Sequence, residues 1–388
     1  MKKFFKSAML LGMAVLFAVS FNSCKKDSNS SDPSGDDTQK QAVINQFVDH
    51  TVAPTYTALA NHTDELVDDL KTLKNEMTQA NVNEACETFL EARKWWEKSE
   101  AFLFGAASDF GIDPHIDSWP LDEDAFNNLM ASPNMIAALD SENGDVIAGE
   151  QLGNALLGFH GIEYVLFREG APRPVEEPTN DYMIYAVAVA GDLRNRCVQL
   201  EVSWIGDEAD EEHVALMEEL EFNVTVNGGD YSYGENIKRA GNAGSTYPTL
   251  TNALQAIIDG SITIADEVGT SKIGKPHTGE DPTYVESPYS QKSIIDFYDN
   301  ILSIQNSYMG GNEGERDETK SMHAYLNNID SDLDARVIEA INTALEKINA
   351  MEAPFVYNYS HPSAGEAMEA CQELSDVLAE AKEAIAEY

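Results

Sequence analysis

The feature that most constrains this chain is a helical spacing of apolar residues from about residue 41 to its end. Over residues 41–72, apolar side chains recur every three to five positions, from Val43 and Phe47 through to Leu66 and Leu70. Such spacing lines one face of an α-helix, and a helix of this kind must bury that face against other helices. The expected fold class is therefore all-α, built from helical bundles.

The pattern divides into two sets of four helices. The first set is expected at 41–72, 83–105 (ending at Gly105), 147–168 and 179–204, with the loop 109–126 crossing one end. The second is expected at 250–268, 293–310, 332–351 and 365–388. Residues 222–248 are rich in Gly, Asn and aromatic residues, and 223–234 are compatible with a small hairpin. We therefore predict an N-terminal domain at 41–221, a connection at 222–248 and a C-terminal domain at 249–388.

The N-terminus has the pattern of an export signal. Three lysines precede an apolar stretch over residues 8–21, which is too short for a stable membrane span and predicts a signal peptide at 1–23. Ser23 before Cys24 resembles a lipoprotein processing site, so Cys24 is the expected lipid attachment point. Residues 24–40 are polar and predict a disordered tether. We expect a lipid-anchored envelope protein at the outer membrane, facing the periplasm or the cell surface; the alternative is ordinary cleavage with Cys24 unmodified.

Charge and cysteine content exclude some functions. The formal net charge is −42, and such a surface repels nucleic acid and anionic lipid head groups, so contact with the membrane is expected only through the anchor. Beyond Cys24 the chain holds Cys86, Cys197 and Cys371, which allow at most one disulfide and require none. The zinc-peptidase, serine-hydrolase and nucleotide-binding motifs are absent from the sequence.

One pair of residues stands out from this background, in the segment GFHGIE. His160 and Glu163 are three positions apart on an apolar helical run, so both side chains point the same way. Imidazole and carboxylate together suit zinc, iron or copper, and Gly158 lets another backbone or a ligand approach. The alternative is a buried histidine hydrogen-bonded to its own glutamate. Because an unpartnered buried carboxylate is costly, either case predicts a polar cluster facing the pair.

Several blocks, in order, resemble the imelysin-like proteins, a family filed among the metallopeptidases. They are RKWWEKSEAFLFG with DSWPLD, then GFHGIE for the family's GxHxxE motif, then IADEVGTSKIGKP, then VESPYSQKSIIDFYDNILSIQNSYMG. The resemblance covers roughly residues 40–350. It implies two related helical bundles with a cleft between them, and a role in bacterial iron uptake alongside iron-transport proteins.

The resemblance also selects further site candidates. Glu97 and Glu100 join His160 and Glu163 as candidate metal ligands, for iron or zinc. The motif and cleft positions are Gly158, Asp266, Glu267, Glu286, Ser287 and Ser290. Arg93 lies one turn before Glu97, and a pairing between them would make that glutamate structural.

Three functions remain open. The first is a non-catalytic lipoprotein of iron acquisition that binds a metal ion or metal complex between the domains. The second is a metal-dependent peptidase using His160 and Glu163, although such an enzyme needs about three protein ligands, an open position for water and a general base. The third is a cell-surface interaction protein in which the motif is a structural hydrogen-bond node.

Overall fold

A computed structural model describes residues 35–388 of the chain. The predicted signal peptide, Cys24 and the tether up to residue 34 lie outside the described residues. Residues 35–40 were predicted to belong to the tether, and this was wrong: they form the start of α1 (Gly35–Phe47). Lys40 is buried there, and its Nζ lies 3.1 Å from Thr251 Oγ1 in the second half of the chain.

The first group of long helices forms a closed ring. Its members are α2 (Ala53–Asn75), α3 (Gln79–Glu97), α9 (Gly158–Leu166) and α10 (Asn180–Ile205). Helix α2 packs between α3 and α10, and the shorter α9 contacts both α3 and α10. Threonine caps mark two of the helix starts, because Thr78 and Thr179 each accept a hydrogen bond from a backbone N–H of the first turn.

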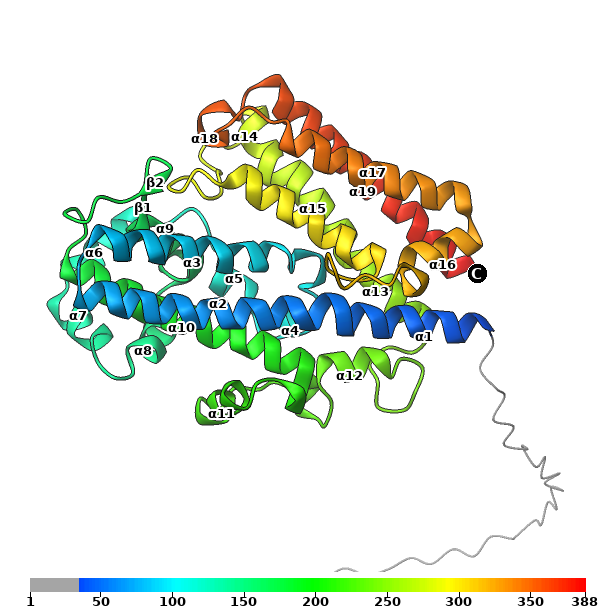
Figure 1. The fold of residues 1–388 in the computed structure, drawn as a ribbon, viewed down its shortest axis with the longest axis horizontal. Coiled ribbons are helices and arrows are strands. Elements are labelled where there is room, and N and C mark those ends of the chain that lie inside the picture. Colours follow the sequence, from blue (N-terminus) through cyan, green and yellow to red (C-terminus); the bar gives the residue numbers. More distant parts are fainter. Residues whose placement is uncertain (1–34) are drawn as a thin grey trace, which may run out of the picture.

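The second group is also a closed ring, and Figure 1 shows it stacked against the first. Its members are α13 (Leu250–Glu267), α15 (Ser293–Met309), α17 (Ser331–Asn349) and α19 (Pro362–Glu387). Each helix packs against two others in the order α13, α19, α17, α15. The all-α class with two bundles is therefore confirmed.

Short elements connect these helices. They are a π-turn (Val48–Val52), a 3-10 turn (Glu100–Phe102), α4 (Ala106–Asp109), α5 (Asp113–Ile116), α6 (Glu123–Met130), α7 (Pro133–Leu139), α8 (Gly144–Gln151), a 3-10 turn (Asn154–Leu156), β1 (Phe167–Arg168), β2 (Ala171–Pro172), a 3-10 turn (Gly206–Glu208), α11 (Glu211–Glu219), a 3-10 turn (Val226–Gly228), α12 (Tyr233–Lys238), a π-turn (Val268–Ile273), α14 (Gly274–Thr278), a 3-10 turn (Glu318–Lys320), α16 (Met322–Ile329) and α18 (Phe355–Asn358). The antiparallel pair β1–β2 is the sheet found among the described residues.

Two local predictions were wrong. The helix expected over 147–168 is interrupted, because Gly153 and Leu157 adopt extended backbone conformations between α8 and α9. The hairpin expected at 223–234 is instead a loop that contains a 3-10 turn, closed by a hydrogen bond from Val226 N–H to the Tyr231 carbonyl. The helix expected at 179–204 was confirmed as α10.

The two bundles share a continuous apolar core, which runs from Val43 in α1 to Ile385 in α19. One close approach between them uses Gly260 of α13, where a Cβ atom would lie 2.1 Å from the carbonyl oxygen of Ala101. Helix α3 contacts α15 across the same interface. The end of α3 and the start of α15 therefore lie close together, and the polar cluster described below occupies this place.

Two further findings concern the described residues taken together. Cys86, Cys197 and Cys371 are free and buried. Among residues 35–388, none of the helices has both the length and the hydropathy that crossing a membrane requires.

Candidate functional site at the interface of the two bundles

The GxHxxE segment begins helix α9 at a point of very close backbone contact. Gly158 has φ +67°, and a Cβ atom there would lie 1.8 Å from the carbonyl oxygen of Ile116. The glycine therefore admits the end of α5 rather than a ligand. This contact brings Asp117, the residue after Ile116, next to the side chain of His160.

His160 is 2% exposed and lies between two carboxylates. Its Nε2 is 2.9 Å from Asp117 Oδ1, and its Nδ1 is 3.3 Å from Glu163 Oε2. Burial alone would lower the pKa of His160, but the two hydrogen bonds outweigh burial and raise that pKa to about 9. At neutral pH the imidazole is therefore a cation that donates from both nitrogens, which leaves it without a lone pair for a metal.

Glu163 is held by the segment that precedes α15. Its Oε1 accepts hydrogen bonds from the backbone N–H groups of Tyr289 (3.1 Å) and Ser290 (2.8 Å) and from the Ser290 hydroxyl (2.7 Å). Ser290, which the resemblance selected as a motif or cleft position, therefore contacts the pair directly. Both carboxylate oxygens of Glu163 therefore have partners from the protein.

Asp117 is the central acceptor of the site, and the sequence analysis did not select it. Besides His160, it accepts hydrogen bonds from the Arg93 guanidinium and, at 2.8 Å, from Trp96 Nε1. Burial opposes ionisation, but Arg93 and His160 outweigh it and hold the pKa of Asp117 well below its usual range. Asp117 lies in the DSWPLD block, so the block pointed to the right segment without identifying the residue.

Arg93 is a buried cation that joins three carboxylates. It pairs with Glu97 one turn later, as expected, and also with Asp117 and Glu286. Burial opposes its charge, yet these carboxylates raise the pKa of Arg93 well above its ordinary value. Glu97 is thus partly structural, as the pairing predicted.

Lys272, from the π-turn after α13, is the second buried cation. Its Nζ lies 3.2 Å from Glu286 Oε1, 3.6 Å from Glu100 Oε1 and 3.8 Å from Glu97 Oε2. Burial raises the pKa of both Glu97 and Glu100 well above the usual range. Arg93 and Lys272 only partly offset this effect for Glu97, and Lys272 only partly offsets it for Glu100. Lys272 was not predicted to belong to the site. Only the packing of the second bundle against the first brings its ammonium group next to these carboxylates.

The first turn of α15 adds another buried carboxylate, Asp296, which the sequence analysis also missed. Its Oδ2 and the Oε2 of Glu286 are buried and have no hydrogen-bond donor among the described residues. Burial raises the pKa of Asp296 to about 7, and Glu286 adds to the effect while Arg93 opposes it. Ser287, another predicted position, is buried beside it with φ +49°.

Two groups of three side chains bring potential ligand atoms within 4.8 Å of one another: Asp117, His160 and Glu286, and Glu97, Glu286 and Asp296. Arg93 forms ion pairs within both groups. In each of them the guanidinium therefore already neutralises part of the charge that would attract a metal ion.

A cavity of about 230 Å³ lies beside this cluster, between the two bundles. Polar and aromatic side chains line it, namely Glu100, Asp113, Asp117, Ser118, Trp119, Glu267, Lys272 and Tyr284. Burial, with nearby Asp117, raises the pKa of Asp113 to about 6. Glu267 lines this cavity, as predicted for a cleft residue. The same prediction was wrong for Asp266, which is exposed and does not line the cavity.

Trp119 forms the wall between the cavity and the motif histidine. Its ring centroid lies 5.9 Å from that of His160 and 5.1 Å from that of Tyr284, and Lys272 Nζ lies 5.2 Å from its centre. The site is therefore an aromatic-walled opening that leads to a buried network of charges.

Fold and site together define a two-bundle helical protein with a charged cluster at the bundle interface. The imelysin family model matches residues 52–381, and the chain belongs to the imelysin family. It is 30% identical over 277 residues to iron-regulated protein A of Synechococcus elongatus, a match that covers 70% of this chain and 66% of the relative, slightly less than two thirds of its length.

Two solved structures are similar. The crystal structure of an iron-regulated protein A precursor from Parabacteroides distasonis has a TM-score of 0.72 and 26% identity, covering 92% of this chain and 97% of that one. An imelysin-like protein from Psychrobacter arcticum has a TM-score of 0.56 and 12% identity, with coverages of 90% and 93%, and shares the fold.

Proposed function

We propose that this protein is a non-catalytic component of bacterial iron acquisition that binds a metal ion or a metal complex at the site around His160 and Glu163. Membership of the imelysin family and the similarity to iron-regulated proteins support a role connected with iron. The observation that carries the proposal is the charge balance of the buried cluster.

Buried carboxylates outnumber buried cations in this cluster. The carboxylates are Glu97, Glu100, Asp117, Glu163, Glu286 and Asp296, and the cations are Arg93, Lys272 and His160. An uncompensated buried carboxylate is costly, so the excess must be removed by bound protons or by an additional cation. A divalent or trivalent ion supplies the missing positive charge in a single step.

The cavity is the place where such an ion can be held. Glu100, Asp113, Asp117 and Glu267 line it, and carboxylates serve as ligands of both iron and zinc in proteins. These four carboxylates do not form a preassembled close cluster, so the arrangement suits a hydrated ion or a small metal complex. His160 stabilises the ionised form of Asp117 through its hydrogen bond to that carboxylate.

Catalysis is not part of the proposal. A metallopeptidase needs an open metal position and a free general base, whereas both nitrogens of His160 and both carboxylate oxygens of Glu163 are engaged. We expect no cleavage of a peptide library in the presence of zinc or iron. Cleavage that disappears in both His160→Ala and Glu163→Ala would support the peptidase function instead.

Calorimetric titration with ferrous, ferric and zinc ions tests the binding proposal. Replacing Glu100 and Glu267 together by glutamine is expected to weaken binding about tenfold or more, because two charges near the ion are lost. Asp266→Asn is the matched control, since Asp266 neighbours Glu267 in sequence but is exposed. Equal affinity in the wild type and the double variant would contradict the proposal.

The closed hydrogen-bond network of His160 favours a second candidate, an interaction protein in which the motif is a structural node. That function predicts no metal binding by the wild type, combined with a large loss of stability in His160→Gln. The same titration, followed by urea unfolding of this variant, distinguishes the two candidates.

A further inference from the structure

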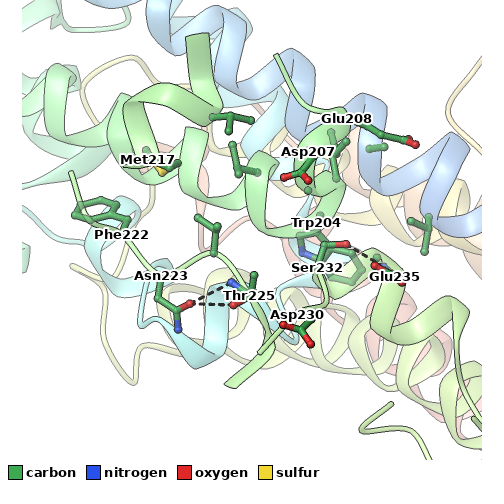
Figure 2. A pocket seen from close by; sticks show the side chains of 18 of the residues that line it. Trp204, Asp207, Glu208, Met217, Phe222, Asn223, Thr225, Asp230, Ser232 and Glu235 are labelled. Carbon is green, nitrogen blue, oxygen red and sulfur yellow. Dashed lines mark hydrogen bonds between the residues drawn. The ribbon is translucent and has the colours of Figure 1, made fainter. Parts of the chain in front are cut away.

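A second and larger cavity is lined by residues from 48–53 and 202–238, and it shares no lining residue with the cavity beside His160. Its volume is about 880 Å³, within the range of pockets that hold small organic ligands. It is bounded by the end of α10, by α11, by the loop that leads to α12, and by the junction of α1 and α2. Figure 2 shows this cavity and the side chains around it.

The lining combines two kinds of side chain. Apolar surface comes from the following residues: Val48, Ala53, Val202, Trp204, Ile205, Val214, Met217, Phe222 and Val224. Acidic groups are supplied by Asp49, Asp207, Glu208, Glu218, Glu221, Asp230 and Glu235, against a single lysine, Lys238. The cavity therefore offers an apolar surface together with a strongly negative field.

Most of these acidic groups lack a basic partner. Asp49 pairs with Lys238, and Glu235 lies 3.7 Å from Arg239. Among the described residues, no ion pair involves the remaining carboxylates, which are Asp207, Glu208, Glu218, Glu221 and Asp230. All five are exposed, so they give the rim of the cavity a negative field that attracts a cation.

The walls of the cavity are fixed by specific contacts. On α11, His213 Nε2 lies 2.8 Å from Asp64 of α2, and its Nδ1 contacts Glu201 of α10. These bonds tie α11 to the bundle, so the wall that carries Val214, Met217 and Glu218 is held in place.

The loop wall is anchored in the same way. Gln199 Nε2 donates to the carbonyl oxygen of Asn223 at 2.9 Å, and the Arg196 guanidinium stacks over the Phe222 ring at 4.5 Å. A pocket with both walls anchored costs little ordering entropy when a ligand enters.

We propose that this cavity binds a small organic cation with an apolar body, such as a hydrophobic amine. The apolar lining accepts the body, and the unpaired carboxylates accept the charged nitrogen. An anionic or purely polar ligand satisfies only one of these two surfaces.

The test compares four probes by calorimetric titration of the intact chain: octylammonium, octanol, octanoate and ethylammonium. Octylammonium is expected to bind, octanol more weakly, and octanoate and ethylammonium not measurably. Octanoate binding as tightly as octylammonium would overturn the proposal, because the carboxylates would then have no role. A basic and apolar peptide that binds where octylammonium does not would also overturn it, in favour of protein docking.

A charge-neutralised variant supplies the second arm. Glu208→Gln, Glu221→Gln and Asp230→Asn together are expected to weaken octylammonium binding about tenfold or more. The matched control, Glu211→Gln, Glu212→Gln and Glu219→Gln, removes the same number of charges from exposed positions outside the cavity. An equal loss of affinity in both triple variants would show that only the overall charge matters, and the proposed site would be refuted.

Discussion

Removing the guanidinium of Arg93 is the most informative perturbation of the charged cluster. Arg93→Met keeps most of the side-chain volume but leaves Asp117, Glu97 and Glu286 without their common cation. Breaking a buried ion pair on one side costs about 3–5 kcal/mol, and three carboxylates depend on this one group. We therefore expect the free energy of unfolding to fall by at least about 3 kcal/mol at neutral pH.

The cost of the substitution should depend on pH. In the wild type the depressed pKa of Asp117 stabilises the fold above the pKa of the unfolded chain, about 3.9, and this contribution is lost as the pH falls through the folded value. In Arg93→Met the carboxylates can instead take up protons, which relieves the repulsion between them. The difference between the two proteins should therefore be largest at about pH 7.5 and smaller at about pH 5.

Urea unfolding followed by circular dichroism at both pH values measures this difference. Arg336→Met is the matched control, because Arg336 also forms a two-pronged pair, with Glu380, but both side chains are about half exposed. The control should barely move the unfolding midpoint. A similar effect of the two substitutions, or a cost for Arg93→Met that is the same at both pH values, would refute the reasoning.

Three further predictions concern single positions. Ser290→Ala removes one hydroxyl bond to Glu163 and should lower the free energy of unfolding by about 1.5–3 kcal/mol in urea titrations, whereas no change would show that the bond is unimportant. Gly158→Ala should prevent stable folding or lower the melting temperature strongly, because its Cβ atom would overlap the Ile116 carbonyl oxygen; a normal melting curve would contradict this contact. The pKa of His213 is raised to about 10 by its carboxylate partners, so His213→Gln should cost most below about pH 6.5, and the cost should vanish as the pH rises toward 10; a cost independent of pH would contradict the ion pairs.

The helices could be predicted because burial on one face leaves a periodic mark in the sequence, as in the segments that became α2, α10 and α17. The break between α8 and α9 could not, since apolar residues continue through Leu156 and Leu157 while the backbone becomes extended. The hairpin at 223–234 failed for a related reason: turn-forming residues there predict a reversal of the chain, but not pairing of the flanking segments.

The site was predicted in part. His160, Glu163 and Ser290 meet as the resemblance implied, because the motif segments lie at the bundle interface. Asp117 and Asp296 were missed, since among 67 acidic residues nothing local distinguishes a buried carboxylate from a solvated one. Only the packing of α3 against α15 and of α9 against the loop after α5 assigns them to the cluster.

We propose that a metal cation occupies the carboxylate-lined cavity beside His160. The most direct test of this proposal is anomalous diffraction at the iron and zinc absorption edges from crystals soaked with each metal. We expect a peak between the two bundles, within coordination or one-water distance of Asp117, Glu100 or Glu267. Crystals that bind metal only at exposed carboxylates, with no peak in this cavity, would contradict it.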